Sequence, residues 1–359
     1  MAPARGAAGD ARGARLHPRR DAHRQRLVAP PRRRTDHRPD RRRPVRPGLL
    51  RLAVCVLLLA LGIALGAGPL QHSNSQRDRE LASQKAELAR RQHRIASLGA
   101  GVSFANAFGA AAGPALTKSV LAGRSVTVVT LPGADPDTVA KLRAAVEAAQ
   151  GKITGQVDLA APMARASSRQ LVEALTSQML TQAPDVSVPA DASGYERFGA
   201  LLARAIGTGP SGQPAQAAYD ATAVGIMSGL QSANLVKASQ AITARAGLAL
   251  VVTGPEAPTT AAAADNAVPV TLLEALGQEL PTVVVGPTGA AGERGVIGSL
   301  RGSPAATKVL STVDSSETAI GQVAGVLALA ARAGGTVGQY GAVHAADGPI
   351  PGAPAPAKP

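Results

Sequence analysis

Three hydrophobic patterns follow one another along the chain. Residues 52–70 are apolar throughout, with 19 positions and no charged side chain. Residues 71–98 are polar and helix-favouring, and place Leu81, Leu88 and Ile95 at seven-residue spacing. From residue 99 onward, short apolar runs alternate with amphipathic stretches. That alternation is typical of a doubly wound, mostly parallel α/β sheet.

The alternating part of the chain predicts strands and helices in turn. Gly123 and Pro132 bound a buried strand, and Asp135 and Pro136 provide the N-cap and first position of the helix that follows. The strand–helix–strand order indicates a βαβ unit with a right-handed crossover. We expect strands at residues 124–132, 152–159, 248–253, 282–286 and, as a short one, 296–299. We expect helices at residues 104–121, 135–150, 167–180, 195–206, 215–232, 270–280 and 314–333, the last one capped by the motif of residues 314–317.

The apolar run at residues 52–70 predicts a transmembrane helix. Its 19 residues extend about 28 Å at 1.5 Å per residue, close to the thickness of the hydrocarbon core. Arginines precede it, which predicts a cytoplasmic N-terminus and an extracytoplasmic position for everything after residue 70. The alternative is a cleaved signal peptide with Ala64 and Gly66 at the small positions of the cleavage site. We favour the uncleaved anchor because the run is long for a signal-peptide core.

Two features predict self-association near this helix. Gly62 and Gly66 form a G-x-x-x-G pair, which is a packing motif of membrane helices, although such helices are rich in glycine generally. The heptad spacing that follows is extended by Leu98, but the complementary positions are polar: Gln84, Lys85, Arg91 and Gln92. A short parallel coiled coil and a single amphipathic stalk helix therefore both remain open.

The basic charge is concentrated in the N-terminal tail. Residues 1–51 contain 16 Arg against 4 Asp, a net charge of +12, whereas the whole chain carries +14. The remaining +2 provides no basic surface for nucleic acid in the rest of the chain. Residues 1–48 are interpreted as a disordered tail. It either binds anionic lipid or nucleic acid, or is a solvated tail or sequence upstream of the true start codon.

Residues with catalytic or metal-binding chemistry are few. The single cysteine, Cys55, lies in the apolar run, so no disulfide forms within the chain. The other donors are scattered, without the spacing of a zinc or copper site: His72, His93, His344, Met163, Met179 and Met227. For the methionines we expect core packing. The glycine-rich loop at residues 286–295 lacks the Lys-Ser/Thr of a phosphate-binding loop, and there is no G-x-S-x-G motif. We therefore predict no enzyme, no catalytic residue and no bound cofactor, and metal ligands stay unknown.

These patterns predict five segments. They are a disordered Arg/Pro-rich tail at 1–48, a transmembrane helix at 50–70, a helical stalk or coiled coil at 71–98, an extracytoplasmic Rossmann/flavodoxin-like domain at 99–345, and a Pro-rich disordered tail at 346–359. Doubly wound sheets bind ligands at the carboxyl ends of their strands, here near Pro132, Gly254 and Gly286.

Several motifs carry a family resemblance. They lie at residues 59–68, 125–135, 155–159, 248–254, 311–314, 321–329 and 338–341. In order and spacing they resemble the MctB-like copper transporter family of mycobacteria and related actinobacteria, over residues 50 to about 345. The Arg-rich tail departs from that family.

The resemblance implies a cell-envelope protein that supports copper efflux and copper resistance, with copper as the transported ion and a pore in an outer membrane. It brings no ligand residues with it. The partners that we expect are membrane lipid and further copies of the chain, joined through the transmembrane helix and stalk, and no nucleic acid. The alternative is an anchored module that binds a ligand or protein as a scaffold, with no transport activity of its own.

Overall fold

The computed structural model describes residues 47–163 and 166–353, apart from the side chains of residues 47–50, 64–75, 166 and 261. The described residues divide into two units, one up to Gln84 and one from Lys85 onward. Helix α1 (Pro47–Leu116) begins in the first unit and ends in the second. Most of the predicted tail at residues 1–48, and the end of the predicted tail at 346–359, lie outside the described residues. The five segment boundaries predicted above stay predictions.

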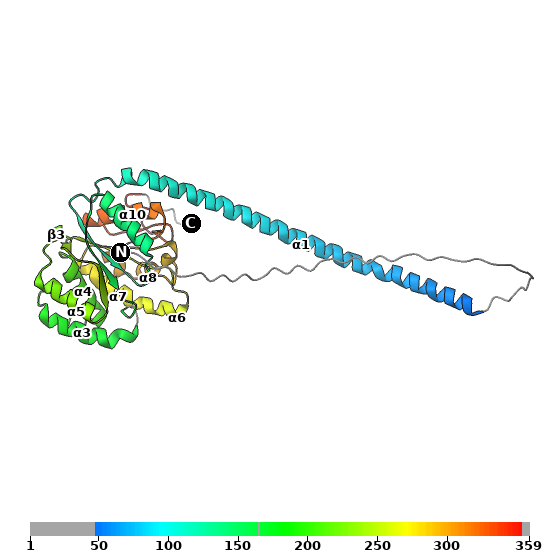
Figure 1. Ribbon diagram of the computed structural model, residues 1–359, viewed down its shortest axis with the longest axis horizontal. Coiled ribbons are helices and arrows are strands. Elements are labelled where there is room, and N and C mark those ends of the chain that lie inside the picture. Colours follow the sequence, from blue (N-terminus) through cyan, green and yellow to red (C-terminus); the bar gives the residue numbers. More distant parts are fainter. Residues whose placement is uncertain (1–46, 164–165, 354–359) are drawn as a thin grey trace, which may run out of the picture. The chain divides into compact units, whose positions relative to one another are not determined.

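A seven-stranded sheet forms the centre of the second unit (Figure 1), in the order β4-β2-β1-β6-β7-β8-β9. Its strands are β1 (Ser125–Thr130), β2 (Lys152–Leu159), β4 (Val236–Gln240), β6 (Leu248–Val252), β7 (Thr282–Val285), β8 (Leu310–Val313) and β9 (Gln339–Tyr340). All neighbours are parallel except β4, which runs antiparallel to β2. The parallel strands β1, β2, β6, β7 and β8, counted in chain order, lie as 2-1-3-4-5. That is the flavodoxin-like order, so the predicted mostly parallel α/β sheet is confirmed.

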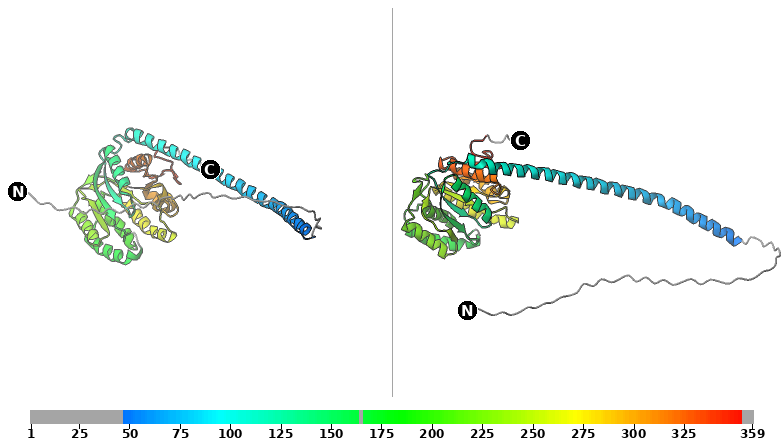
Figure 2. Two further views of the ribbon diagram at one scale, coloured as in Figure 1. Left: turned by 45° about the vertical axis from the view of Figure 1, so that its right-hand side comes forward. Right: turned by 45° about the horizontal axis from the view of Figure 1, so that its top comes forward.

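Two hydrophobic cores lie on opposite faces of the sheet, because successive strand residues point to opposite sides. Val128 belongs to one core and Val129 to the other. Helices α2 (Pro136–Ala148) and α10 (Ala319–Ala333) cover the first face. The second face is covered by α3 (Arg169–Gln182), α4 (Gly194–Ile206), α5 (Ala221–Ser232) and α7 (Ala267–Glu279), together with the short helices α8 (Val296–Gly302) and α9 (Ala306–Val309) (Figure 2). The short strands β3 (Gln216–Ala217) and β5 (Arg245–Ala246) form a separate antiparallel pair.

The last turns of α1 lie against α10. A Cβ atom at Gly109 would come within 2.6 Å of Cγ1 of Ile320, and one at Gly113 within 2.6 Å of Cγ2 of Val323. The Asn106 side chain accepts a hydrogen bond of 2.6 Å from the backbone N–H of Ala319, at the first turn of α10. Small residues therefore let the two helices approach closely, and Asn106 satisfies one of the donors that every helix N-terminus leaves free.

Among the described residues, one helical stretch is long and apolar enough to cross a membrane, Gln76–Leu116. The stretch Arg51–Ile63 is a shorter apolar helix, and it is the part of the predicted transmembrane helix whose side chains the structure describes. The remainder of that prediction, from residue 64 to 70, lies within α1, but its side chains are outside the described set. One apolar helix near the N-terminus is thus present, and a coiled coil stays a prediction.

Several predicted elements are corrected. Residues 296–299 form the start of helix α8 instead of a short strand, and the edge strand β4 was not predicted. The helix expected at 215–232 begins only at Ala221, because the Asp220 side chain caps it. The helix expected at 104–121 ends at Leu116. The cap of the last helix is Thr318 and not the motif at 314–317, because the Asp314 side chain is fully buried and bonded elsewhere.

Candidate functional site

The strand order reverses between β1 and β6, where doubly wound sheets bind ligands. The chain leaves β1 towards α2 on one face and leaves β6 towards α7 on the other. The two loops that follow these strands touch, since a Cβ atom at Gly254 would lie 2.7 Å from the carbonyl carbon of Gly133. Gly133 has a φ of +87°, a conformation that favours glycine. Two glycines therefore bring the loops together at the floor of the site.

A cavity of about 380 Å³ lies beside these two loops. We call it the strand-end crevice. It is lined by Leu131, Pro132, Gly133, Ala161, Thr253, Gly254, Pro255, Glu256, Ala257, Pro258, Ala262, Asp265, Asn266, Pro269 and Val296. Four of these are prolines, which hold the walls rigid, and the polar side chains are Thr253, Glu256, Asp265 and Asn266. Two of the three strand ends predicted from the sequence, Pro132 and Gly254, meet here, while Gly286 is not part of the lining.

One wall of the crevice is fixed by an ion pair. Both the backbone N–H and Nε of Arg294 donate to Oε1 of Glu256, at 3.2 and 3.1 Å. The side-chain hydrogen bond from Arg294 lowers the pKa of the Glu256 carboxyl and raises that of the guanidinium. The carbonyl of Arg294 also accepts from Nδ2 of Asn266, at 3.0 Å, and from the backbone N–H of Ala257, at 3.1 Å. These bonds hold the loop at 286–295 against the loop that follows β6.

The glycine-rich loop at 286–295 is a packed connection. A Cβ atom at Gly295 would lie 2.0 Å from the carbonyl oxygen of Ala290, so this glycine allows the backbone to fold on itself. Gly292 faces the Glu256 carboxylate, with 3.1 Å between Oε1 and an added Cβ atom. A carboxylate at this distance repels phosphate. The interpretation as a plain connection therefore fits the geometry better than a phosphate cradle.

A second cavity, of about 370 Å³, shares Leu131 and Pro132 with the crevice and extends along strand β2. Its polar centre is Asp158, which accepts hydrogen bonds from the hydroxyl of Thr130 at 2.8 Å, from Nε2 of Gln156 at 2.9 Å, and from the hydroxyl of Ser239. Burial raises the pKa of this carboxyl, but the three hydrogen bonds together outweigh it and leave the pKa below its ordinary value. Asp158 is therefore an ionised, fully bonded group at neutral pH.

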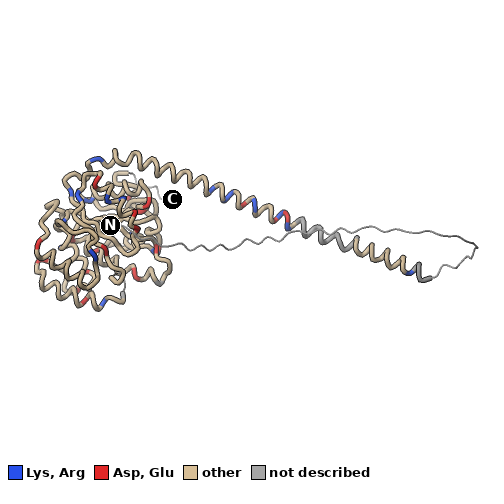
Figure 3. Tube along the Cα trace, viewed as in Figure 1, with Lys and Arg blue, Asp and Glu red and all other residues tan. Residues whose placement is uncertain are grey.

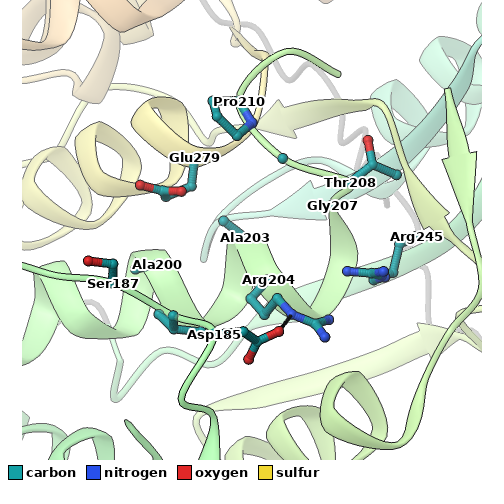
Figure 4. A pocket seen from close by; sticks show the side chains of 12 residues that line it. Asp185, Ser187, Ala200, Ala203, Arg204, Gly207, Thr208, Pro210, Arg245 and Glu279 are labelled. Atoms are coloured by element: carbon teal, nitrogen blue, oxygen red, sulfur yellow. Dashed lines mark hydrogen bonds and ion pairs between the residues drawn. The ribbon is translucent and has the colours of Figure 1, made fainter. Parts of the chain in front are cut away.

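A third cavity lies at the amino ends of the strands, and it is charged (Figure 4). It encloses about 220 Å³, and its lining includes Asp185, Arg204, Arg245 and Glu279. Arg204 donates from Nε to Asp185 and from its two terminal nitrogens to Asp220, at 3.3 and 3.0 Å. Arg245 approaches the same Asp220 carboxylate at 3.3 Å. Because both arginines pair with Asp220, whose side chain also caps α5, this network stabilises the fold.

The described histidine and methionine side chains that were candidates for metal ligands do not form a metal site. Met163, Met179 and Met227 are 1, 6 and 2% exposed and belong to one core cluster, which agrees with core packing. His93 and His344 are exposed on α1 and in the C-terminal loop, and the side chain of His72 lies outside the described residues. Within the part of the chain that the structure describes, no three His, Cys, Asp or Glu side chains form a group that could hold a metal ion.

Sequence reasoning missed the Glu256–Arg294 pair and the polar centre at Asp158. Glu256 and Arg294 are 38 positions apart, and the glycine-rich loop that contains Arg294 gives no sign of its partner. The only signal in the sequence was the position of Glu256 two residues after a glycine at a predicted strand end.

Together these features define a class of protein: a flavodoxin-like α/β domain with a proline-lined strand-end crevice, joined to a long, partly apolar helix. Residues 45–351 match the family described as copper transport outer membrane protein, MctB. The chain belongs to this family, since the match covers most of its length. The resemblance inferred from the motifs is thus confirmed, and the family implies a role in copper transport at the cell envelope. No curated protein matches the chain.

Proposed function

We propose that this protein is a membrane-anchored component of the cell envelope that supports copper efflux and thereby copper resistance. The observation that carries the proposal is the match of residues 45–351 to the copper-transport family. Copper is the cargo in this proposal, and the chain acts without catalysis and without a resident cofactor. The coordinating residues stay unassigned.

The proposed anchor is the helix at residues 50–70, with the N-terminus in the cytoplasm and the α/β domain outside. Large apolar side chains between Leu52 and Ile63 are 52 to 68% exposed in α1, as expected for a surface that faces lipid. The other apolar stretch, Gln76–Leu116, contains charged residues in its first half and lies on α10 in its last turns. We therefore assign that stretch to the stalk and to the contact with the domain.

Deletion of the gene tests the function. We expect a deletion strain to hold more copper and to tolerate less copper in the medium, and the full chain to restore both values. A chain with Leu58→Arg and Leu61→Arg in the anchor is the matched variant, and Arg77→Leu with Arg79→Leu, which leaves the anchor apolar, is its control. Unchanged copper content and tolerance in the deletion strain would remove the efflux role.

Protease treatment of intact spheroplasts tests the topology independently. The proposal expects residues 99–345 to be digested without lysis, because the positive flank stays in the cytoplasm. Protection before lysis, followed by digestion after it, would place the domain in the cytoplasm and contradict the anchor orientation.

The strand-end crevice favours a second candidate function, an anchored module that binds a ligand or a protein as a scaffold. Its site at the switch point of the sheet, its volume and its rigid proline-lined walls fit a small, largely apolar ligand. Thermal unfolding of the full chain in detergent, with and without copper(I), copper(II) and small apolar peptides, separates the two. Stabilisation by peptide alone would favour the scaffold function, and stabilisation by copper alone would favour direct handling of copper.

A further inference from the structure

The middle of helix α1 exposes apolar side chains on the side of the helix that leads to α10. Leu88, Ile95, Leu98 and Val102 are 58, 69, 64 and 62% exposed. We call these four residues the α1 stripe. Leu88, Ile95 and Val102 follow at seven-residue intervals, and Leu98 lies three residues after Ile95, so they occupy heptad positions a and d. Leu81 continues the same spacing one heptad earlier.

The α1 stripe is continuous with an interface that already exists inside the domain. One heptad after Val102 comes Gly109, which is buried against Ile320 of α10. Before Ala105, the next residue at position d, every described side chain of α1 is exposed. The α1 stripe is therefore exposed on one side of the helix. The same side packs against α10 from Gly109 onward.

We propose that a second copy of this chain covers the α1 stripe as a parallel, in-register helix pair. A helix with heptad spacing can pair with an identical helix across a two-fold axis. A binding site for an unrelated partner does not need this spacing. The parallel direction rests on the proposed function, because two chains anchored in the same membrane orientation present α1 side by side.

The charges next to the stripe agree with this direction. Lys85 occupies position e of the heptad in which Leu81 is position a, and Glu80 occupies position g of the heptad before it. In a parallel pair, position g of one helix lies beside position e of the next heptad in the other, so Glu80 meets Lys85 of the second copy. Figure 3 shows charged residues on this part of α1, and none between Arg94 and the end of the helix.

Arg91 defines the register of the pair. It occupies a d position between Leu88 and Ile95, and its guanidinium forms an ion pair of 2.6 Å with Glu87 of its own helix. A polar residue at a core position weakens a helix pair but restricts its register and copy number. Polar layers at Arg91 and, one heptad earlier, at Gln84 therefore favour the in-register arrangement over shifted ones.

Cysteine cross-linking of the full chain in native membranes tests the pair. In a Cys55→Ser background no other cysteine remains. Single cysteines are introduced at Leu88, Ile95 and Val102, and in control chains at Ala86 and Ala100, which occupy the outward position f. We expect a short bis-maleimide to give roughly tenfold more cross-linked dimer at the stripe than at the controls, because a positions of parallel helices face each other. Equal yields at both sets would overturn the proposal.

A charge variant gives an independent readout. We expect Ile95→Glu to convert the detergent-solubilised chain from dimer to monomer in sedimentation, while Ala100→Glu stays dimeric and both keep the circular dichroism of the native domain. A monomeric native chain would overturn the proposal. Mixed Leu81→Cys and Val102→Cys chains provide a second check: more cross-linking between the two variants than within each one would also overturn it, because the helices would then not be in register. A native dimer in a chain that does not restore copper tolerance would contradict the proposed function and leave the helix pair standing.

Discussion

At the carboxyl edge of the sheet, one strand end is covered by the chain, and two others border an open cavity. At the end of β8 the segment after β9 closes over the strand, and a buried ion pair holds it there. Asp314 is fully buried. Its carboxylate accepts a hydrogen bond of 3.0 Å from Nη1 of Arg301, and further ones from the backbone N–H groups of Ala342 and Val343. At the ends of β1 and β6 the chain leaves a cavity of about 380 Å³.

The open end of the edge is available for binding, and the closed end is not. The closed end uses Arg301, whose nitrogens also donate to the carbonyls of Tyr340 and Val343, so that both charged groups, Arg301 and Asp314, are bonded within the fold. Burial lowers the pKa of Arg301, and the Asp314 carboxylate opposes this effect. The open end uses a half-buried pair, Glu256 with Arg294, and rigid prolines. The first arrangement holds the fold together, and the second shapes a site.

The largest expected effect is at the closed end. Asp314→Ala leaves the Arg301 guanidinium buried without its carboxylate, and we expect it to lower the free energy of unfolding by about 3–5 kcal/mol. Glu317→Ala removes a nearby exposed carboxylate and is expected to cost about 1 kcal/mol or less. Urea unfolding of the full chain followed by circular dichroism measures both. Equal losses in the two variants would mean that the buried ion pair contributes no more than the exposed hydrogen bonds between Thr288 and Glu317.

The next effect is at the floor of the crevice. Gly254→Val places a side chain where a Cβ atom already lies 2.7 Å from the Gly133 backbone, and we expect a loss of about 1–3 kcal/mol by overpacking. Gly225→Ala is the control, since an added Cβ atom there meets nothing within 4 Å in helix α5. We expect it to raise the stability by about 0.5–1 kcal/mol. A neutral Gly254→Val would show that the two loops do not touch in solution.

A smaller effect is expected where α1 meets α10. Asn106→Ala leaves the N–H of Ala319 without its acceptor, which should cost about 0.5–1 kcal/mol. Ser103→Ala, on the same helix and exposed, serves as the comparison and should change little. Thermal unfolding separates them, and identical midpoints would argue against the Asn106 contact.

The smallest effect is the pH response of the crevice wall. The pKa of Glu256 is lowered below its ordinary 4.5 in the folded protein. Its stabilising contribution is therefore fully present above the ordinary pKa and is lost as the pH falls through the lowered folded value. Carbon-detected NMR titration of Glu256 should show the lowered pKa, and Arg294→Gln should raise it towards 4.5. An unchanged pKa in that variant would contradict the role of the ion pair.

The sequence predicted those parts of the fold that depend on local pattern. The buried strand from Ser125 and the helix capped by Asp135 follow from alternation, glycine and capping chemistry, and the structure confirms both. The Met residues were assigned to the core for the same reason. Strand β4 escaped prediction because an edge strand with alternating exposed residues, Val236–Gln240, has no apolar run.

Long-range contacts explain the remaining errors. Asp314 resembles a helix cap in sequence, but Arg301 and the backbone of residues 342–343 occupy its oxygens in the fold. The crevice was predicted at the correct edge from the strand ends at Pro132 and Gly254. Its polar wall could not be predicted, because Glu256 meets Arg294 only after two separate loops have packed.

The rate at which copper leaves preloaded cells tests the central proposal most directly. Cells that lack the chain, cells with the full chain, and cells with the anchor variant Leu58→Arg with Leu61→Arg are loaded with copper and transferred to copper-free medium. We expect rapid loss only with the full chain. Equal rates of copper loss in all three would contradict a role in efflux.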